Sequence, residues 1–143
     1  METNRGYRDM KKACKILTIL GIIYNSIVLL GYVIRTIFSQ RLAYITYNNI
    51  DGSIPAFLTF EIFKVLYLMA LIFEIVFYTA CLVMVSISFA YIQKDASKKL
   101  PHILIIVSGA LTSNPLYIVA GILGVINSSK EKKDVVEVEV VNG

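Results

Sequence analysis

The stretch from Val65 to Ile92 is the feature that most restricts how this chain can fold. It is an apolar run of 28 residues with a single acid, Glu74, inside it. As an α-helix the run would be roughly 40 Å long, whereas the hydrocarbon core of a bilayer is roughly 30 Å thick. Each apolar residue favours insertion by roughly 0.3–0.6 kcal/mol, and together they outweigh a cost of about 3 kcal/mol for one charge. The run therefore predicts a membrane helix that tolerates its acid.

Composition extends this prediction to the whole chain. Of the 143 residues 57% are hydrophobic, and the mean hydropathy is +0.70. Two further apolar runs cover 16–38 and 103–126, and the segments between them are too short to bury cores of their own. We expect an all-α, polytopic integral membrane bundle. It has two full spans plus a C-terminal broken helix or short hairpin, which gives three or four membrane helices.

The charge pattern predicts the topology. The net charge is +4, and the basic residues form short clusters beside the apolar runs, within 1–15, 93–102 and 127–133. Such flanks follow the positive-inside rule, which argues against a nucleic-acid partner. We expect a multi-pass protein of the cell membrane with a cytoplasmic N-terminus and a cytoplasmic C-terminus. Its parts are a basic lead (1–15), a single membrane domain (16–128) with an outer loop (39–56), and a charged tail (129–143).

Two polar segments carry alternating patterns. Leu42–Tyr47 within the outer loop is consistent with a short extended piece. In the tail, valine alternates with glutamate after residue 136, a period typical of strands. Such a tail can pair with the edge of a partner's sheet, but we expect it to be disordered.

The last apolar run has two interpretations, because Ser113-Asn114-Pro115 interrupts it. These residues are typical of a helix stop, a turn and a new helix start. The run is either one kinked span or a hairpin of two half-length helices, 102–112 and 115–128. We favour the hairpin, because it places all three basic clusters on one side of the membrane.

Small and weakly polar residues recur at helical spacings on the apolar runs. Cys81 and Ser88 follow Glu74 at intervals of seven and so share its face. Small residues allow membrane helices to approach closely. The predicted helix-packing residues are Gly21, Ala70, Cys81, Ser88, Ser108, Thr112, Ala120 and Gly124.

Several polar residues are predicted to converge near the middle of the bilayer. At 1.5 Å per residue, Asn25 lies roughly 14 Å deep, Glu74 roughly 15 Å and Asn114 roughly 18 Å. Many transporters bind substrate at this depth. With Tyr78 and Pro115, these residues form the candidate midplane polar cluster.

Two stretches carry a resemblance to a known family. They are Lys98-Lys99-Leu-Pro-His-Ile-Leu-Ile-Ile-Val-Ser-Gly109 with Pro115–Ile126 and the lysines that follow, and Lys15-Ile-Leu-Thr-Ile-Leu-Gly-Ile22 with its basic lead. They resemble small four-helix membrane proteins of Gram-positive bacteria, a family of unknown function. The resemblance involves mostly residues 98–133 and 11–22. It implies four helices with both termini inside and no activity; the longer outer loop, Glu74 and the acidic tail depart from it.

Motifs of catalysis are missing from the sequence. It contains no phosphate-binding loop, no dinucleotide fingerprint and no H-E-x-x-H, and one histidine with two separated cysteines has no zinc spacing. We therefore expect no catalytic, cofactor or metal site. The expected partners are the lipid bilayer and another membrane protein, or a second copy. The leading hypothesis is a non-catalytic subunit or modulator of a larger membrane complex. The alternatives are a small oligomeric transporter or channel that uses Glu74, and an immunity protein against a membrane-active toxin.

Overall fold

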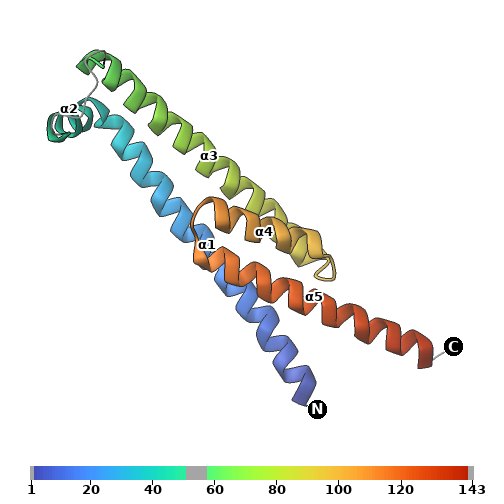
Figure 1. The fold of residues 1–143 in the computed structure, drawn as a ribbon. Coiled ribbons are helices and arrows are strands. Elements are labelled where there is room, and N and C mark those ends of the chain that lie inside the picture. The colour runs from blue at the N-terminus through green and yellow to red at the C-terminus, as the bar shows by residue number, and fades with distance from the viewer. Residues whose placement is uncertain (1, 51–57, 142–143) are drawn as a thin grey trace. The chain divides into compact units, whose positions relative to one another are not determined.

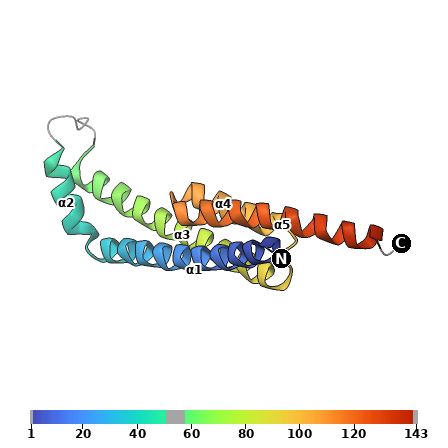
Figure 2. The same cartoon turned by 90° about the horizontal axis from the view of Figure 1, so that it is seen from below.

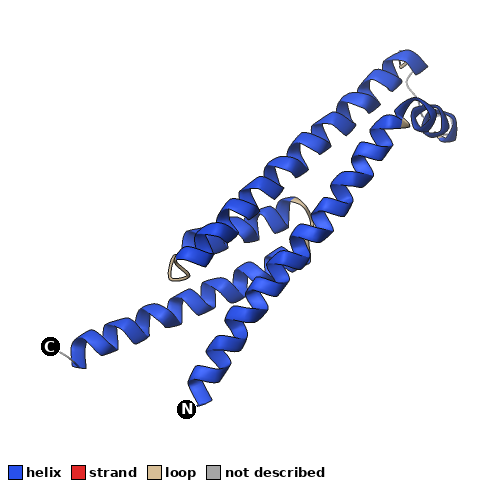
Figure 3. Ribbon diagram, turned by 180° about the vertical axis from the view of Figure 1, so that it is seen from behind, coloured by secondary structure: helices blue, strands red, loops and turns tan. Residues whose placement is uncertain are grey.

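The computed structural model describes residues 2–50 and 58–141, and this part of the chain is helical (Figures 1 and 3). It contains five helices and no strand, which confirms the all-α fold class. The helices are α1 (Glu2–Ile37), α2 (Ser39–Asn49), α3 (Phe60–Lys94), α4 (Lys99–Leu111) and α5 (Pro115–Val141).

Two helices are long and apolar enough to cross a membrane. They are the Arg8–Ile37 part of α1 and the whole of α3, whereas α4 is apolar but shorter. In each of the two, only 17% of the most apolar window is buried. The core helix of a water-soluble protein would be mostly buried, so these helices expose their apolar side chains instead.

The chain divides into two compact units. The hairpin unit comprises Met1–Asn25 and Cys81–Gly143, and the loop unit comprises Ser26–Ala80. In the hairpin unit, α4 and α5 run antiparallel to each other (Figures 1 and 2). The first part of α1 and the second part of α3 complete this unit. Its apolar core consists of Val85, Ile92, Ile105, Tyr117 and Ala120.

The C-terminal apolar run is a hairpin rather than one kinked span. Its two arms, α4 and α5, are separated by the turn at 112–114. The turn coincides with the predicted break, because Pro115 has no N–H to donate and fits the first position of a new helix. The second arm, α5, extends to Val141 and is therefore longer than the predicted 115–128.

The outer connection differs from its prediction. Leu42–Tyr47, expected to be extended, lies within α2. Ala43 is buried and Tyr47 half-buried, whereas Ile45 between them is exposed. In a strand all three would lie on one face, but in a helix Ile45 points away from the other two. The alternation of apolar and polar residues in this short segment fits both a strand and a helix, so it did not predict the helix. Residues 51–57 of the predicted outer loop lie outside the described residues.

The tail also differs from its prediction. We expected residues 129–143 to be disordered, but α5 continues as far as Val141, and 142–143 lie outside the described residues. The lysines and Glu131 that follow Ser129 are good helix formers. A helix that has already begun extends through such residues easily, because propagation costs far less than nucleation.

A short turn connects α3 to α4. The Asp95 carboxylate accepts hydrogen bonds from the Ser97 hydroxyl (2.6 Å) and the Ser97 backbone N–H (3.1 Å). Lys98 lies 3.7 Å from the same carboxylate. The hydrogen bonds from Ser97, with the charge of Lys98, lower the pKa of Asp95 below its ordinary value of 3.8. Helix α4 then begins at Lys99 with Pro101 in its first turn, where a missing N–H is harmless.

Candidate functional site

The turn between α4 and α5 positions the central residue of the candidate site, Asn114. Ser113 adopts a left-handed conformation with φ of 51°. The Asn114 N–H donates to the Gly109 carbonyl at 2.8 Å, and the Ser113 N–H donates to the Ala110 carbonyl at 3.5 Å. These two bonds form a Schellman motif, which satisfies carbonyls that the end of α4 would leave unpaired. The motif fixes the backbone from which the Asn114 side chain projects.

The Asn114 side chain joins α5 to α1 through its amide group. Its Oδ1 accepts a hydrogen bond from the Leu116 N–H (3.1 Å) and thereby caps α5. Its Nδ2 donates to the Gly21 carbonyl (3.1 Å) and to Asn25 Oδ1 (3.0 Å). Asn25 and Asn114 are both completely or almost completely buried. We call Gly21, Asn25 and Asn114 the amide junction.

A lack of side-chain bulk on α1 allows this close approach. A Cβ atom on Gly21 would overlap the ring of Tyr117, which lies in α5 and is fully buried. Farther down the same face, the Cys14 thiol donates to the Ala120 carbonyl at 3.2 Å. Helix α1 therefore contacts α5 on one continuous face, and Gly21 and Ala120 are two of the predicted packing residues.

The two arms of the hairpin also pack through glycines. A Cβ on Gly124 would overlap the ring of His102, and one on Gly121 would lie 2.7 Å from the His102 carbonyl. Near the turn, a Cβ on Gly109 would meet Ile118 at 2.9 Å. Gly124 was among the predicted packing residues, whereas Gly109 and Gly121 were not. The three-residue spacing of Gly121 and Gly124, which places both on one helix face, was a signal available in the sequence.

The remaining predicted packing residues divide into two groups. Cys81, Ser88, Ser108 and Thr112 are buried in the hairpin unit. The Ser108 and Thr112 hydroxyls donate to backbone carbonyls one turn earlier, at 2.9 and 2.7 Å. Ala70, in contrast, is exposed on α3 in the loop unit.

Within the described residues, several buried polar atoms of the hairpin unit have no hydrogen-bond partner. They are Asn25 Nδ2, Ser88 Oγ, the Tyr117 hydroxyl and Asn127 Oδ1. Leaving such a group unpaired costs about 1–3 kcal/mol. The interior of this unit is therefore more polar than its apolar sequence indicates. No group of three or more His, Cys, Asp or Glu suited to a metal ion occurs in the described part of the chain.

Comparison with other proteins gives no match. No protein-family model matches this sequence, and no curated protein or solved structure does so either. The amide junction and the exposed faces described next are therefore the basis for inferring a function.

Glu74 and Tyr78 of the predicted midplane cluster belong to the loop unit. The ring of Tyr78 packs against that of Tyr32 in α1, with centroids 5.2 Å apart and the planes tilted by 45°. Glu74 is half-buried, and no hydrogen bond or ion pair joins its carboxyl group to another described residue. The structure thus brings Asn25 and Asn114 together, whereas the participation of Glu74 and Tyr78 stays a prediction. Pro115 is exposed at the start of α5.

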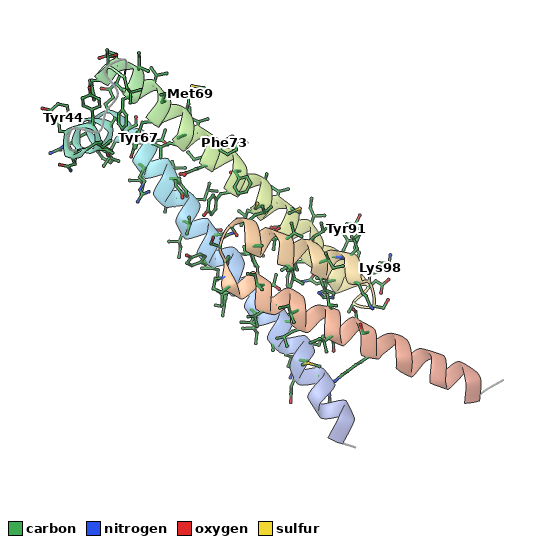
Figure 4. All side chains as sticks on the ribbon, in the orientation of Figure 1. Tyr44, Tyr67, Met69, Phe73, Tyr91 and Lys98 are labelled. Atoms are coloured by element: carbon green, nitrogen blue, oxygen red, sulfur yellow. The ribbon has the colours of Figure 1, made fainter. Side chains whose placement is uncertain are left out.

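The face of α3 around Glu74 is apolar and partly exposed, since Ala70 and Phe73 are exposed whereas Glu74 and Phe77 are half-buried. Ala70, Phe73, Glu74 and Phe77 follow the spacing of a single helix face. Phe73 is 69% exposed and projects outward from α3, as does Met69 one turn earlier (Figure 4). Its ring stacks on that of Phe77, with centroids 6.2 Å apart. We call these four residues the acidic face.

Proposed function

We propose that the protein is a multi-pass membrane protein without catalytic activity, which packs against another membrane protein as a subunit or modulator of a larger complex. The apolar and exposed lengths of α1 and α3 support the membrane setting. Both termini are proposed to be cytoplasmic, consistent with the basic clusters at 1–15 and 93–102.

The acidic face is the observation that carries the proposal. An ionised carboxylate in the bilayer costs about 2.5–3.5 kcal/mol, so intramembrane acids are protonated or paired. No described residue bonds to Glu74. Exposed Ala70, one turn away, leaves room for the backbone of a second helix to approach. The proposed partner is a membrane helix that offers a hydrogen-bond donor to Glu74.

Affinity capture from native membranes tests this proposal. The tagged wild type should recover a membrane protein in fixed stoichiometry. Because a hydrogen bond between membrane helices contributes about 0.6–1.7 kcal/mol, Glu74→Leu should reduce that recovery by roughly 3- to 20-fold. Glu74→Gln should retain it, since an amide still forms hydrogen bonds. Glu61→Leu is the matched control, because Glu61 lies on the same helix, is exposed and pairs with Lys64 at 2.6 Å.

Two results would contradict the proposal. One is capture of no stoichiometric partner, and the other is unchanged recovery by Glu74→Leu. The transporter alternative makes the opposite prediction for Glu74→Gln. An amide cannot exchange a proton at this site, so proton-driven flux into reconstituted vesicles should disappear in Glu74→Gln although the protein is still inserted.

A further inference from the structure

An open pocket of about 250 Å³ lies on the second part of α1, within the loop unit. Its lining residues are Val28, Gly31, Tyr32 and Arg35. Because they are three, four and seven residues apart, they occupy one face of the helix. Neither the amide junction nor the acidic face uses these residues.

Gly31 and Tyr32 give the pocket its shape. A Cβ on Gly31 would meet nothing within 4 Å, so the absent side chain leaves open space. Beside it, the Tyr32 ring packs against the ring of Tyr78, with centroids 5.2 Å apart. The groove thus has open space at Gly31 and an aromatic wall at Tyr32.

Arg35 places a positive charge at one end of the groove. Its guanidinium carbon lies 5.9 Å from the centroid of the Tyr32 ring, a cation–π distance. Arg35 is exposed, and no ion pair of the described residues involves it. Guanidinium groups bind phosphate through two parallel hydrogen bonds. The position therefore favours an anionic group, above all a phosphate.

The charge and the apolar lining of the groove suit part of a lipid. Arg35 lies in the last turn of α1, where a membrane helix reaches the headgroup region, and Val28 lies roughly 10 Å deeper along the axis. Pockets for compact small molecules usually measure about 300–1,000 Å³ and enclose most of the ligand. An open groove of this size, charged at the interface and apolar toward the interior, suits a headgroup and the upper part of one acyl chain.

We infer that Val28, Gly31, Tyr32 and Arg35 bind one anionic phospholipid, with its phosphate on Arg35 and an acyl chain beside Gly31. This inference rests on the membrane setting of the proposed function but not on the partner of Glu74. The two are distinguishable, because loss of capture by Glu74→Leu leaves lipid binding unchanged.

Native mass spectrometry of the purified full chain in detergent tests the site. The probes are phosphatidylglycerol and phosphatidylcholine with identical acyl chains. The wild type should bind one phosphatidylglycerol roughly tenfold more tightly than phosphatidylcholine, as expected for a hydrogen-bonded charge pair. Arg35→Gln should abolish this preference. Arg41→Gln, which removes the same charge from an exposed position in α2, should retain it.

A second variant tests the apolar part of the groove. Gly31→Leu should fill the pocket and weaken the binding of both lipids at least fivefold. Gly6→Leu is its control, because a Cβ on Gly6 also meets nothing within 4 Å. The inference is wrong if Arg35→Gln keeps the preference, if Gly31→Leu binds like Gly6→Leu, or if millimolar inorganic phosphate displaces the lipid completely. If Gly31→Leu loses its helical circular dichroism, the inference is decided by the preference for phosphatidylglycerol in Arg35→Gln compared with that in Arg41→Gln.

Discussion

Asn114 satisfies three separate demands with one side chain. It caps α5 through Oδ1, and it binds a backbone carbonyl and a side-chain oxygen of α1 through Nδ2. Serine or aspartate would also cap a helix, but neither offers an NH₂ group with two donors. The residue type is therefore determined by the contact with α1 as much as by the turn.

Asn114→Ala measures the combined contribution of these roles to stability. Asn114→Ala removes the cap, worth about 1 kcal/mol, and the hydrogen bonds to α1, worth about 0.6 kcal/mol or more each in a membrane protein. We expect a loss of about 2–3 kcal/mol in the free energy of unfolding, measured by denaturation in detergent.

Asn114→Asp provides the sharper comparison. It retains the capping oxygen, but it replaces the donor with a second acceptor that faces the Gly21 carbonyl and Asn25 Oδ1. We expect it to be no more stable than Asn114→Ala. A double-mutant cycle with Asn25→Ala should give a coupling energy clearly above zero, and additive losses would show that the two amides are independent.

At the scale of the element, the α4–α5 turn uses a residue that is not ideal for its conformation. Ser113 has a φ of 51°, a region that costs an L-residue roughly 1–2 kcal/mol and costs glycine nothing comparable. Glycine is accordingly the usual residue at this position of a Schellman motif. The Cβ of Ser113 is tolerated here because both hydrogen bonds of the motif form.

Ser113→Gly should stabilise the protein by about 0.5–1 kcal/mol, because relief of strain exceeds the added entropy of the unfolded chain. Ser113→Val should destabilise it by more than that amount, since a β-branched residue is worse in this region. Thermal unfolding followed by circular dichroism measures both. An equal effect of the two substitutions would exclude backbone strain as the cause.

The sequence predicted the elements that depend on local chemistry. Ser113-Asn114-Pro115 located the break because helix end, turn and helix start all act within a few residues. Leu42–Tyr47 was predicted wrongly because six residues fit both periods, and the contact that decides, Tyr47 against Phe60 with ring centroids 5.5 Å apart, is tertiary. The tail was predicted wrongly because it is the last part of α5: the helix starts at Pro115 and extends into the tail, so it does not have to begin within the tail.

At the scale of the whole molecule, both chain ends and the α3–α4 turn lie toward one end of the hairpin unit. The start of α1, the α3–α4 turn and the end of α5 lie toward the same end of this unit, and the α4–α5 turn lies toward the other (Figures 1 and 2). This arrangement agrees with the three basic clusters in the sequence and supports a common side for both termini.

Reporter fusions test this arrangement directly. A reporter that is active only in the cytoplasm should be active when fused after Gly143, and also when it is inserted at Ser97. The same reporter inserted after Asn49 should be inactive, because the α2 connection is proposed to lie outside. Activity at Asn49 or inactivity at Gly143 would contradict the proposed topology.

The candidate site was only partly accessible from sequence. Depth along each apolar run placed Asn25 and Asn114 at similar heights, because 1.5 Å per residue is a reliable measure. The faces that meet depend on rotation and register, which no single sequence specifies. For this reason Gly21 was predicted as a packing residue, but its contact with Tyr117 was not, and neither was the role of Gly121.

The amide junction has a consequence for the order of synthesis. Asn25 and Asn114 are 89 positions apart, and a ribosome that adds roughly 5–20 residues per second needs roughly 4–18 s to make the intervening chain. In the proposed membrane setting, the amide of Asn25 is inserted long before its partner exists. Water or the insertion machinery must hold that amide meanwhile, so α1 reaches its final environment only when the last helix emerges.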